Sequence, residues 1–395
     1  MREIAAAWEE FLHFSPGPRR DVRVFHAPGR VNLIGEHLDY NGGPVLPAAL
    51  SLGVWLFARP RLDGVSRFAS QTFAGIGETP IADVRKGRPG DFANYPKGVY
   101  QVMGEHSPFP LPAADLYYAG NLPSGAGLAS SAAVEVATAL ALSTIGELGF
   151  TLLELAQMAQ RAENEFVGVQ CGIMDQLAIA MGREGHAILL HSATLRHEYI
   201  PVPLPEHCLV IAHSGKTREL AASKYNERRL ECRRAFLALA AHRPELCGLA
   251  DGSVDIGEES VGDIVEDPQL LRRLRHVFSE TRRVQAAAAA LRQGQIEEFG
   301  RQMSASHRSL RDDFEVTGAE LDRLAESAWQ ADGCLGSRMT GAGFGGCTVS
   351  LVRRDAVDAF RRQVTENYCR ATGITPTLYV SDIAQGAREV TDEVR

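Results

Sequence analysis

The chain has 395 residues, of which 45% are hydrophobic and 23% are charged, and its formal net charge is -8. This size predicts a large core shared by two packed domains, because a single core stops growing near ~250–300 residues. The negative charge and the scattered lysines and arginines argue against nucleic acid or an anionic membrane surface as a partner. Any phosphate site must therefore be local.

Cysteine usage and hydropathy point to a cytoplasmic enzyme. The seven cysteines are widely spaced and form no C-x-x-C pair. This pattern favours neither a disulfide framework nor a zinc site, and it indicates reduced, mostly buried thiols. No segment reaches the ~18 apolar residues of a membrane span.

The chain opens with an expected helix near residues 3–13 and a strand over 22–27 that should stop at Pro28-Gly29. The loop over residues 30–43 then holds four ionisable side chains between glycines: Arg30, Glu36, His37 and Asp39. Such loops often carry binding groups, although a charged loop alone is more often solvated surface. Apolar strands on both sides argue that this loop is anchored to the core.

The next expected elements are mostly strands, at residues 45–50, 54–58, 65–73 and 114–120, with a surface loop over 74–91 and a helix over 91–103. Phe92, at the start of that helix, is interpreted by composition as a core residue.

A glycine-rich loop over Asn121–Ala133 runs directly into an Ala/Leu/Val helix. The first turn of a helix has unpaired backbone N–H groups and the positive end of the macrodipole. Gly125 and Gly127 would let a phosphate approach these groups, and Ser130 and Ser131 add hydroxyls. Alternatively, the glycines form a tight turn and the serines are N-cap candidates.

A single acid, Asp175, follows Gly168 and Gly172 in an otherwise apolar segment. It comes after a helix that a Thr151–Glu154 capping box should open. Such an acid is either a helix N-cap or dipole partner, or a buried carboxylate with a chemical task.

Strands at residues 187–190 and 208–212 flank a stretch with three prolines, which we interpret as the boundary between domains of residues 1–203 and 204–395. The second half should contain helices over 218–241 and from 268 to about 331, an acidic loop over 251–266, a capping box at Thr317–Glu320, a glycine-rich loop over 336–346, a strand over 347–352, a helix from about 355 to 373 and a last strand over 377–381.

These motifs together resemble the GHMP kinase superfamily and, within it, the galactokinase family. Gly29–Tyr40 is similar to the family's sugar-loop signature, Leu122–Ala132 to its phosphate loop, and Arg338–Cys347 to its third motif. Further similarity lies at 162–168, 171–176 and 225–229. The resemblance implies a two-domain α/β (α+β type) fold, ribosomal-S5-domain-2-like at the N-terminus and ferredoxin-like at the C-terminus, with the active site in the cleft between the domains.

The resemblance also implies ATP-dependent phosphorylation of the anomeric hydroxyl of D-galactose, with Mg²⁺, by a monomer. It makes Asp175 the catalytic base, with Arg30 beside it to lower the barrier. The implied sugar-binding residues are Glu36, His37, Asp39, Gly172 and Tyr225. Ser131 and Glu163 match the magnesium pair. The implied ATP-binding residues are Phe92, where many members have Trp, and Ser124, Gly125, Ala126, Gly127, Leu128, Ala129, Ser130 and Ser131.

Two departures from the family pattern concern the sugar. Leu38 replaces the usual Thr, and His213-Ser214-Gly215 replaces an Asn-Ser stretch. They are either neutral or reshape the pocket toward a related sugar such as galactosamine, N-acetylgalactosamine, galacturonate or arabinose. A different hypothesis is a regulator that binds sugar and ATP without catalysis.

Overall fold

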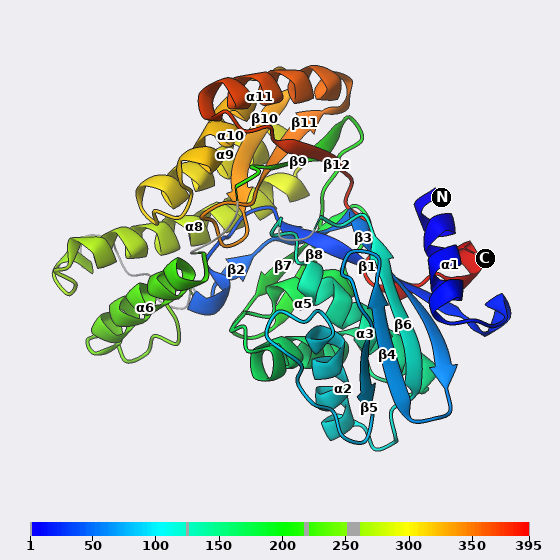
Figure 1. Cartoon of the computed structure of the whole chain (residues 1–395). Helices are drawn as coiled ribbons and strands as arrows, with labels where there is room; N and C mark the ends of the chain where they lie inside the picture. The colour runs from blue at the N-terminus through cyan, green and yellow to red at the C-terminus, as the bar shows by residue number, and fades with distance from the viewer. Residues whose placement is uncertain (1, 124–125, 217–220, 251–260, 395) are drawn as a thin grey trace.

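The computed structural model describes residues 2–123, 126–216, 221–250 and 261–394 (Figure 1). A six-stranded sheet in the order β13-β1-β3-β6-β4-β5 carries the first part of the chain. Its strands are β1 (Arg23–Asn32), β3 (Pro47–Arg61), β4 (Val65–Ser70), β5 (Gly77–Pro80), β6 (Ala113–Gly120) and β13 (Arg388–Glu389). All pairs are antiparallel except β4 with β6.

Helices cover both faces of this sheet. On one face α1 (Arg2–Phe14) packs Trp8 and Phe11 against Phe57 of β3 and Tyr117 of β6. On the other face lie α2 (Asn94–His106), α3 (Ser130–Ile145), α4 (Leu152–Arg161) and α5 (Met174–Met181). This layer brings the starts of α3 and α5, where the glycine loop and the lone acid lie, to the same part of the fold.

The predicted capping box opens α4: Glu154 N–H donates to Thr151 Oγ1, and Thr151 N–H donates to Glu154 Oε2. The helix then widens into a π-helical turn over Ala162–Val167 and ends at Gly168, where φ is +93°. Such widened turns are often found at functional sites. This one carries the buried Glu163.

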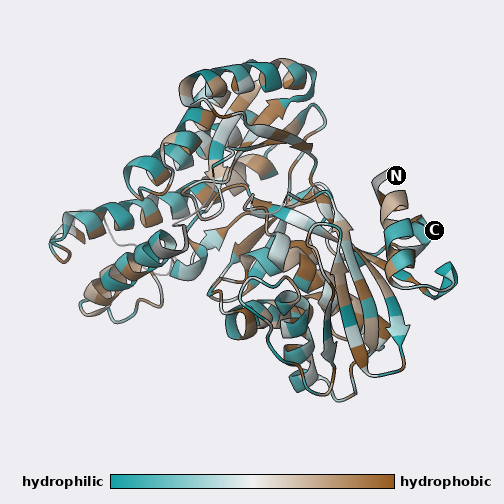
Figure 2. Cartoon of the chain, viewed as in Figure 1, coloured by the Kyte–Doolittle hydropathy of each residue, from teal (hydrophilic) through white to brown (hydrophobic). Residues whose placement is uncertain are grey.

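A second, four-stranded sheet in the order β10-β11-β9-β12 carries the later part of the chain. It consists of β9 (His207–His213), β10 (Cys334–Thr340), β11 (Cys347–Arg353) and β12 (Thr377–Ser381), with helices α9 (Ile296–Asp312), α10 (Ala319–Trp329) and α11 (Val357–Thr372) around it. Figure 2 shows brown, hydrophobic segments on the strands of both sheets, while the outer helices are largely teal.

Three strands, β2 (Pro44–Val45), β7 (His186–His191) and β8 (Arg196–Pro201), form a small sheet between the two larger ones. The long helices α6 (Ala221–Ala240) and α8 (Pro268–Arg292) extend beside it (Figure 1). Asp267 caps α8 through Gln269 N–H, and proline occupies the first helical position, as the sequence predicted.

The two large sheets meet at the end of β1. Arg338 on β10 donates from Nη1 to the carbonyl oxygen of Asn32 (2.9 Å), and Thr340 Oγ1 donates to the same oxygen (3.2 Å). Arg338 is fully buried. The third glycine-rich motif, which starts on β10, is therefore fixed directly against the polar loop that follows β1.

Several expected boundaries were wrong. β1 does not stop at Pro28-Gly29: its pairing with β3 shifts register by two residues between Pro28 and Arg30, and the strand continues to Asn32. β3 passes through Pro60, since beyond Ala58 it pairs with β6 alone and proline is tolerated in such edge segments. Two segments expected to be irregular, 77–80 and 196–201, are the strands β5 and β8.

The structure also corrects one capping assignment and excludes one capping alternative. The helix α10 begins after Gly318, which makes no side-chain cap, and the carboxylate of Glu320 instead accepts from Lys216 Nζ (2.7 Å). The residue before α3 is Ala129, so Ser130 and Ser131 lie inside the helix and are not its cap. Neither serine hydroxyl therefore caps α3, and the hydroxyl of Ser131 is instead hydrogen-bonded to Glu163.

The chain does not end at β12. After it, β13 pairs with β1 in the register Phe25 with Glu389, and α12 (Thr391–Val394) follows. The expected division after residue 203 stays a prediction. Among the described residues, no helix combines the length and the apolar character that a membrane crossing needs.

Candidate active site

Arg30 and Asp175 form a two-pronged ion pair. Arg30 Nε donates to Asp175 Oδ1 (2.8 Å) and Nη2 donates to Oδ2 (2.6 Å). The third nitrogen, Nη1, donates to the carbonyl oxygen of Gly127 (2.7 Å). The Asp175 side chain keeps 26% of its surface exposed, whereas Arg30 keeps 7%. One buried guanidinium thus holds the carboxylate in a fixed orientation beside the glycine-rich loop.

The described part of the predicted phosphate loop has a strained backbone just before α3. Gly127 has φ +81° and Ala129 has φ +61°, a region that residues other than glycine rarely adopt. Leu128 and Ala126 are buried beneath the loop. Ser124 and Gly125 lie outside the described residues. The turn leads into the first N–H groups of α3, which are suited to binding an anion.

Ser131 and Glu163 lie in contact, as expected for a pair that shares an ion. Ser131 Oγ donates to Glu163 Oε1 (3.0 Å), and Gln176 Nε2 donates to Oε2 (2.6 Å). Burial and the nearby charge of Asp175 raise the pKa of Glu163. A bound cation would offset the free-energy cost of keeping the buried Glu163 carboxylate ionised. Within the described residues no group of three His, Cys, Asp or Glu side chains could hold a metal. One hydroxyl and one carboxylate suit Mg²⁺, which usually keeps waters and phosphate oxygens as its other ligands.

A cavity of about 430 Å³ collects the residues assigned to catalysis and sugar binding. Its lining includes Arg30, Glu36, His37, Asp39, Glu163, Gly172, Asp175 and Tyr225, and also Gly341 and Ala342 of the third motif. This one cavity is therefore lined by residues of β1, of the loop after β1, of the segment that leads into α5, and of α6.

The sugar loop is held in place by buried polar contacts. Glu36 Oε1 accepts from Gly341 N–H (2.5 Å), and burial raises the pKa of this carboxyl. His37 Nδ1 is 2.9 Å from the hydroxyl of Tyr40. Burial lowers the pKa of His37 to about 3, so its imidazole is neutral at pH 7 and can act as donor and acceptor. Its backbone adopts φ +64°, a conformation that residues other than glycine rarely adopt.

Gly172 has a steric reason to be glycine. A Cβ atom at this position would overlap the carboxylate of Asp39. Asp39 thus lies directly against the backbone of the segment that leads into Asp175.

A second cavity, of about 140 Å³, lies next to the start of α3 and is lined by Phe73, Phe92, Tyr95, Ser130 and Ser131 among others. The rings of Phe73 and Phe92 stack with centroids 5.7 Å apart and an interplanar angle of 10°. Phe92 is half-buried: it lines this cavity and also packs against the edge of the main core.

Sequence reasoning did not single out Phe73 and Gly341, which line the two cavities, or Tyr40, which contacts His37. Tyr40 and Gly341 lie within the quoted motifs, so the motif itself was the available signal. Phe73 follows an ordinary strand, and nothing in the sequence marks it; its stacking on Phe92 is a tertiary contact.

Comparisons with known proteins agree with this geometry. Three family models match: "GHMP kinases N terminal domain" over residues 94–183, "Galactokinase galactose-binding signature" over 10–60 and "GHMP kinases C terminal" over 287–369. The galactokinase of Bacillus subtilis is 44% identical over 95% of this chain and 97% of its own, and that of Halalkalibacterium halodurans is 43% identical over 95% of both. The chain belongs to the galactokinase family.

Solved structures show the same relationship. The Lactococcus lactis galactokinase, solved in complex with galactose, is 38% identical with a TM-score of 0.91, and the match covers 98% of this chain and 99% of that one. The Methanococcus jannaschii mevalonate kinase, 17% identical over 93% of this chain and 100% of its own, has a TM-score of 0.68 and shares the fold. The expected GHMP kinase fold is confirmed, and the chain is a sugar kinase.

The ionisation of Asp39 should set the pH below which the protein binds its sugar poorly. Burial raises the pKa of Asp39 to about 6, and the neighbouring charge of Asp175 adds to this. Above that pH the carboxylate can accept hydrogen bonds from sugar hydroxyls, and below it the group is protonated. We therefore expect kcat/KM for the sugar to fall as the pH drops through about 6. In Asp39→Asn this step should be absent from the pH profile, although overall activity is lower. A wild-type profile that is flat between pH 7 and pH 5 would contradict the assignment.

Proposed function

We propose that the protein transfers the terminal phosphoryl group of ATP to the C1 hydroxyl of D-galactose, giving galactose 1-phosphate and ADP. The observation that carries this proposal is the contact of Arg30 with both Asp175 and Gly127, since it joins the sugar cavity to the phosphate loop. Phosphoryl transfer depends mainly on positioning and charge stabilisation. The contacts of Arg30 supply both the positioning and the charge stabilisation.

Each residue has a separate task in this proposal. The Asp175 carboxylate accepts the proton of the C1 hydroxyl as its oxygen attacks phosphorus in line with the leaving ADP oxygen. Arg30 keeps the carboxylate oriented and places positive charge near the developing negative charge. Glu36, His37, Asp39 and Tyr225 bind the remaining hydroxyls, and the backbone of Gly172 leaves room for Asp39. The N–H groups at the start of α3 bind the phosphates.

Ser131 and Glu163 would hold Mg²⁺, which neutralises phosphate charge when it is bound. Phe92 and Phe73 would contact adenine. Ala126, Gly127, Leu128 and Ala129 shape the phosphate loop together with Ser124 and Gly125. We also propose that the protein acts as a cytoplasmic monomer.

The two sequence departures support galactose as the substrate. Leu38 is fully buried, and neither it nor residues 213–215 contribute to the lining of the 430 Å³ cavity. Ser214 is buried too, and its carbonyl accepts from Tyr368 Oη (2.7 Å). Neither sequence departure therefore changes the side chains that line the cavity.

An ADP-release assay with a sugar panel tests the proposal. We expect turnover with galactose to exceed that with galactosamine, N-acetylgalactosamine, galacturonate and arabinose. A site built to hydrogen-bond particular hydroxyls rejects analogues strongly, by up to about 10⁴-fold. EDTA should abolish activity and added Mg²⁺ should restore it. Binding of galactose without turnover would instead favour the non-catalytic regulator.

A further inference from the structure

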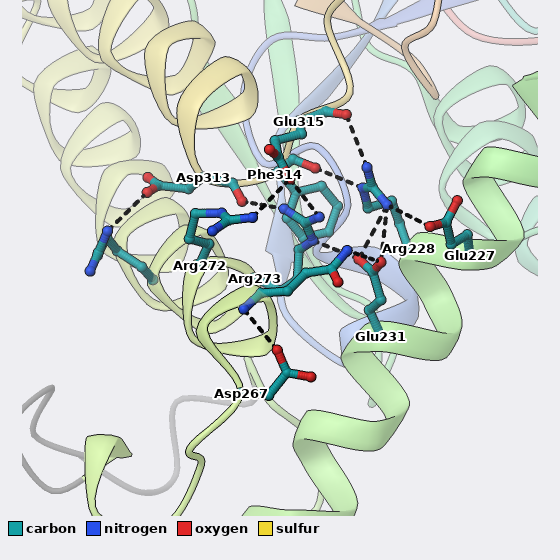
Figure 3. Close-up of polar contacts among 11 residues, drawn as sticks. Glu227, Arg228, Glu231, Asp267, Arg272, Arg273, Asp313, Phe314 and Glu315 are labelled. Carbon is teal, nitrogen blue, oxygen red and sulfur yellow. Dashed lines mark hydrogen bonds and ion pairs between the residues drawn. The ribbon is translucent and has the colours of Figure 1, made fainter.

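Two buried arginines outside the cavity tie α6 and α8 to the loop after α9 (Figure 3). Arg228 on α6 donates from Nε to the carbonyl oxygen of Phe314 (2.8 Å) and from Nη2 to that of Glu315 (3.3 Å). Arg273 on α8 donates from Nη1 to the carbonyl oxygen of Asp313 (2.6 Å). Three successive carbonyls are thus held by two guanidinium groups.

Carboxylates balance these two cations. Glu231 accepts from Arg273 Nε (2.6 Å) and from Arg228 Nη1 (3.1 Å), and Glu315 accepts from Arg273 Nη2 (2.7 Å). Arg228, Glu231 and Arg273 are 8%, 6% and 0% exposed. We call these three residues the brace. Buried ion pairs of this kind often add little stability over apolar packing, but they fix geometry.

The brace reaches the sugar end of the cavity by two routes. On α6, Tyr225 lies one turn before Arg228 and lines the cavity. In the loop, the ring of Phe314 packs with its centroid 4.8 Å from that of His37, which is itself 5.7 Å from the ring of Tyr225. Both sugar-binding rings therefore rest on parts of the fold that the brace holds.

The same loop also supports the third motif. The carbonyl oxygen of Val316 accepts from Phe344 N–H (2.7 Å), and a Cβ at Gly343 would collide with that carbonyl. Gly341, two residues earlier in the motif, donates its N–H to Glu36. The loop after α9 is thus connected to a third sugar-binding side chain.

We propose that Arg228 and Arg273, linked by Glu231, are positioning residues that set sugar affinity without acting on the nucleotide. The aromatic cavity for the base lies on the six-stranded sheet and α3, and none of its lining residues comes from α6, α8 or the loop after α9. The inference rests on the proposed sugar-kinase function of the same site.

Arg228→Lys is the first test, because lysine keeps the charge but lacks the fork that reaches two carbonyls and a carboxylate. We expect KM for galactose, and Kd for galactose by calorimetry, to rise at least about tenfold, since misplacing binding groups by ~1 Å costs up to about 100-fold. KM for ATP should stay within about twofold. The matched control is Arg234→Lys on the same helix, whose side chain is 67% exposed and 3.6 Å from Asp267. In this control, KM for galactose and KM for ATP should both stay unchanged.

Glu231→Gln is the second variant and decides the matter if Arg228→Lys does not fold, as judged by thermal unfolding. It keeps the shape of the side chain but removes the negative charge that links the two arginines. We expect the same selective rise in galactose KM. The inference is overturned if a folded variant retains wild-type galactose affinity, or if the constants for galactose and ATP rise in the same proportion.

The sugar panel separates this inference from the proposed function. If the wild type turns over or binds another panel sugar in preference to galactose, the proposed substrate is wrong, and the brace variants are assayed with that sugar. The expected selective loss then applies to that sugar, and its absence overturns the inference.

Discussion

Asp175→Asn should reduce turnover by about 10²–10⁴-fold, the usual contribution of a positioned general base. Asparagine has nearly the same shape and can still accept one N–H from Arg30, so the fold should persist. It cannot accept the proton of the C1 hydroxyl. Galactose Kd by calorimetry should therefore change little while kcat falls, and steady-state ADP release measures the loss.

Asp355→Asn is the matched control for this change, because its side chain is 75% exposed and its partner Arg353 is at the surface. Its kcat should equal that of the wild type. If Asp175→Asn retained kcat within about tenfold of the wild type, the carboxylate would not be the base.

Gly172→Ala should weaken sugar binding more than Asp175→Asn does. The added Cβ would occupy the space of the Asp39 carboxylate, so the carboxylate or the segment before Asp175 must move. We expect KM for galactose to rise by roughly 10–100-fold, because displacement of a binding group by ~1 Å has an effect of this size. KM for ATP should stay near the wild-type value, and initial-rate kinetics in both substrates measure the split.

Gly104→Ala on α2 provides the control for adding a methyl group. A Cβ there would have only Leu111 Cδ1 as a neighbour, at 3.9 Å, so we expect wild-type kinetics. An unchanged galactose KM in Gly172→Ala would show that Asp39 does not bind the sugar from its position in the structure.

The motif residues were predictable because their chemistry is local. The loop that carries Glu36, His37 and Asp39, the helix start at Ser130 and the lone acid at Asp175 are each visible as short patterns of residue types. Their convergence on one cavity was carried over from the family resemblance. Hydropathy alone gives no distance between β1 and α5.

The remaining features depend on tertiary contacts that a one-dimensional pattern does not contain. The register shift between β1 and β3, which lies directly before Arg30, depends on how the two strands pair. The capping box expected at Thr317 does not form: the helix begins after Gly318, and the Glu320 carboxylate accepts from Lys216, which is distant in sequence. Likewise, Ala129 adopts a left-handed conformation that its residue type disfavours, which local propensity cannot predict.

The return of β13 to β1 has a consequence for biosynthesis. The strands β13 and β1 are also joined by the ion pair of Arg23 with Glu389. Trp8 Nε1 donates to the carbonyl oxygen of Val394, so both ends of the chain lie beside one sheet (Figure 1). Ribosomes make residues 388–389 after all the other strands of that sheet. During translation β1 therefore remains an open edge, a surface prone to wrong pairing, until residues 388–389 emerge from the exit tunnel.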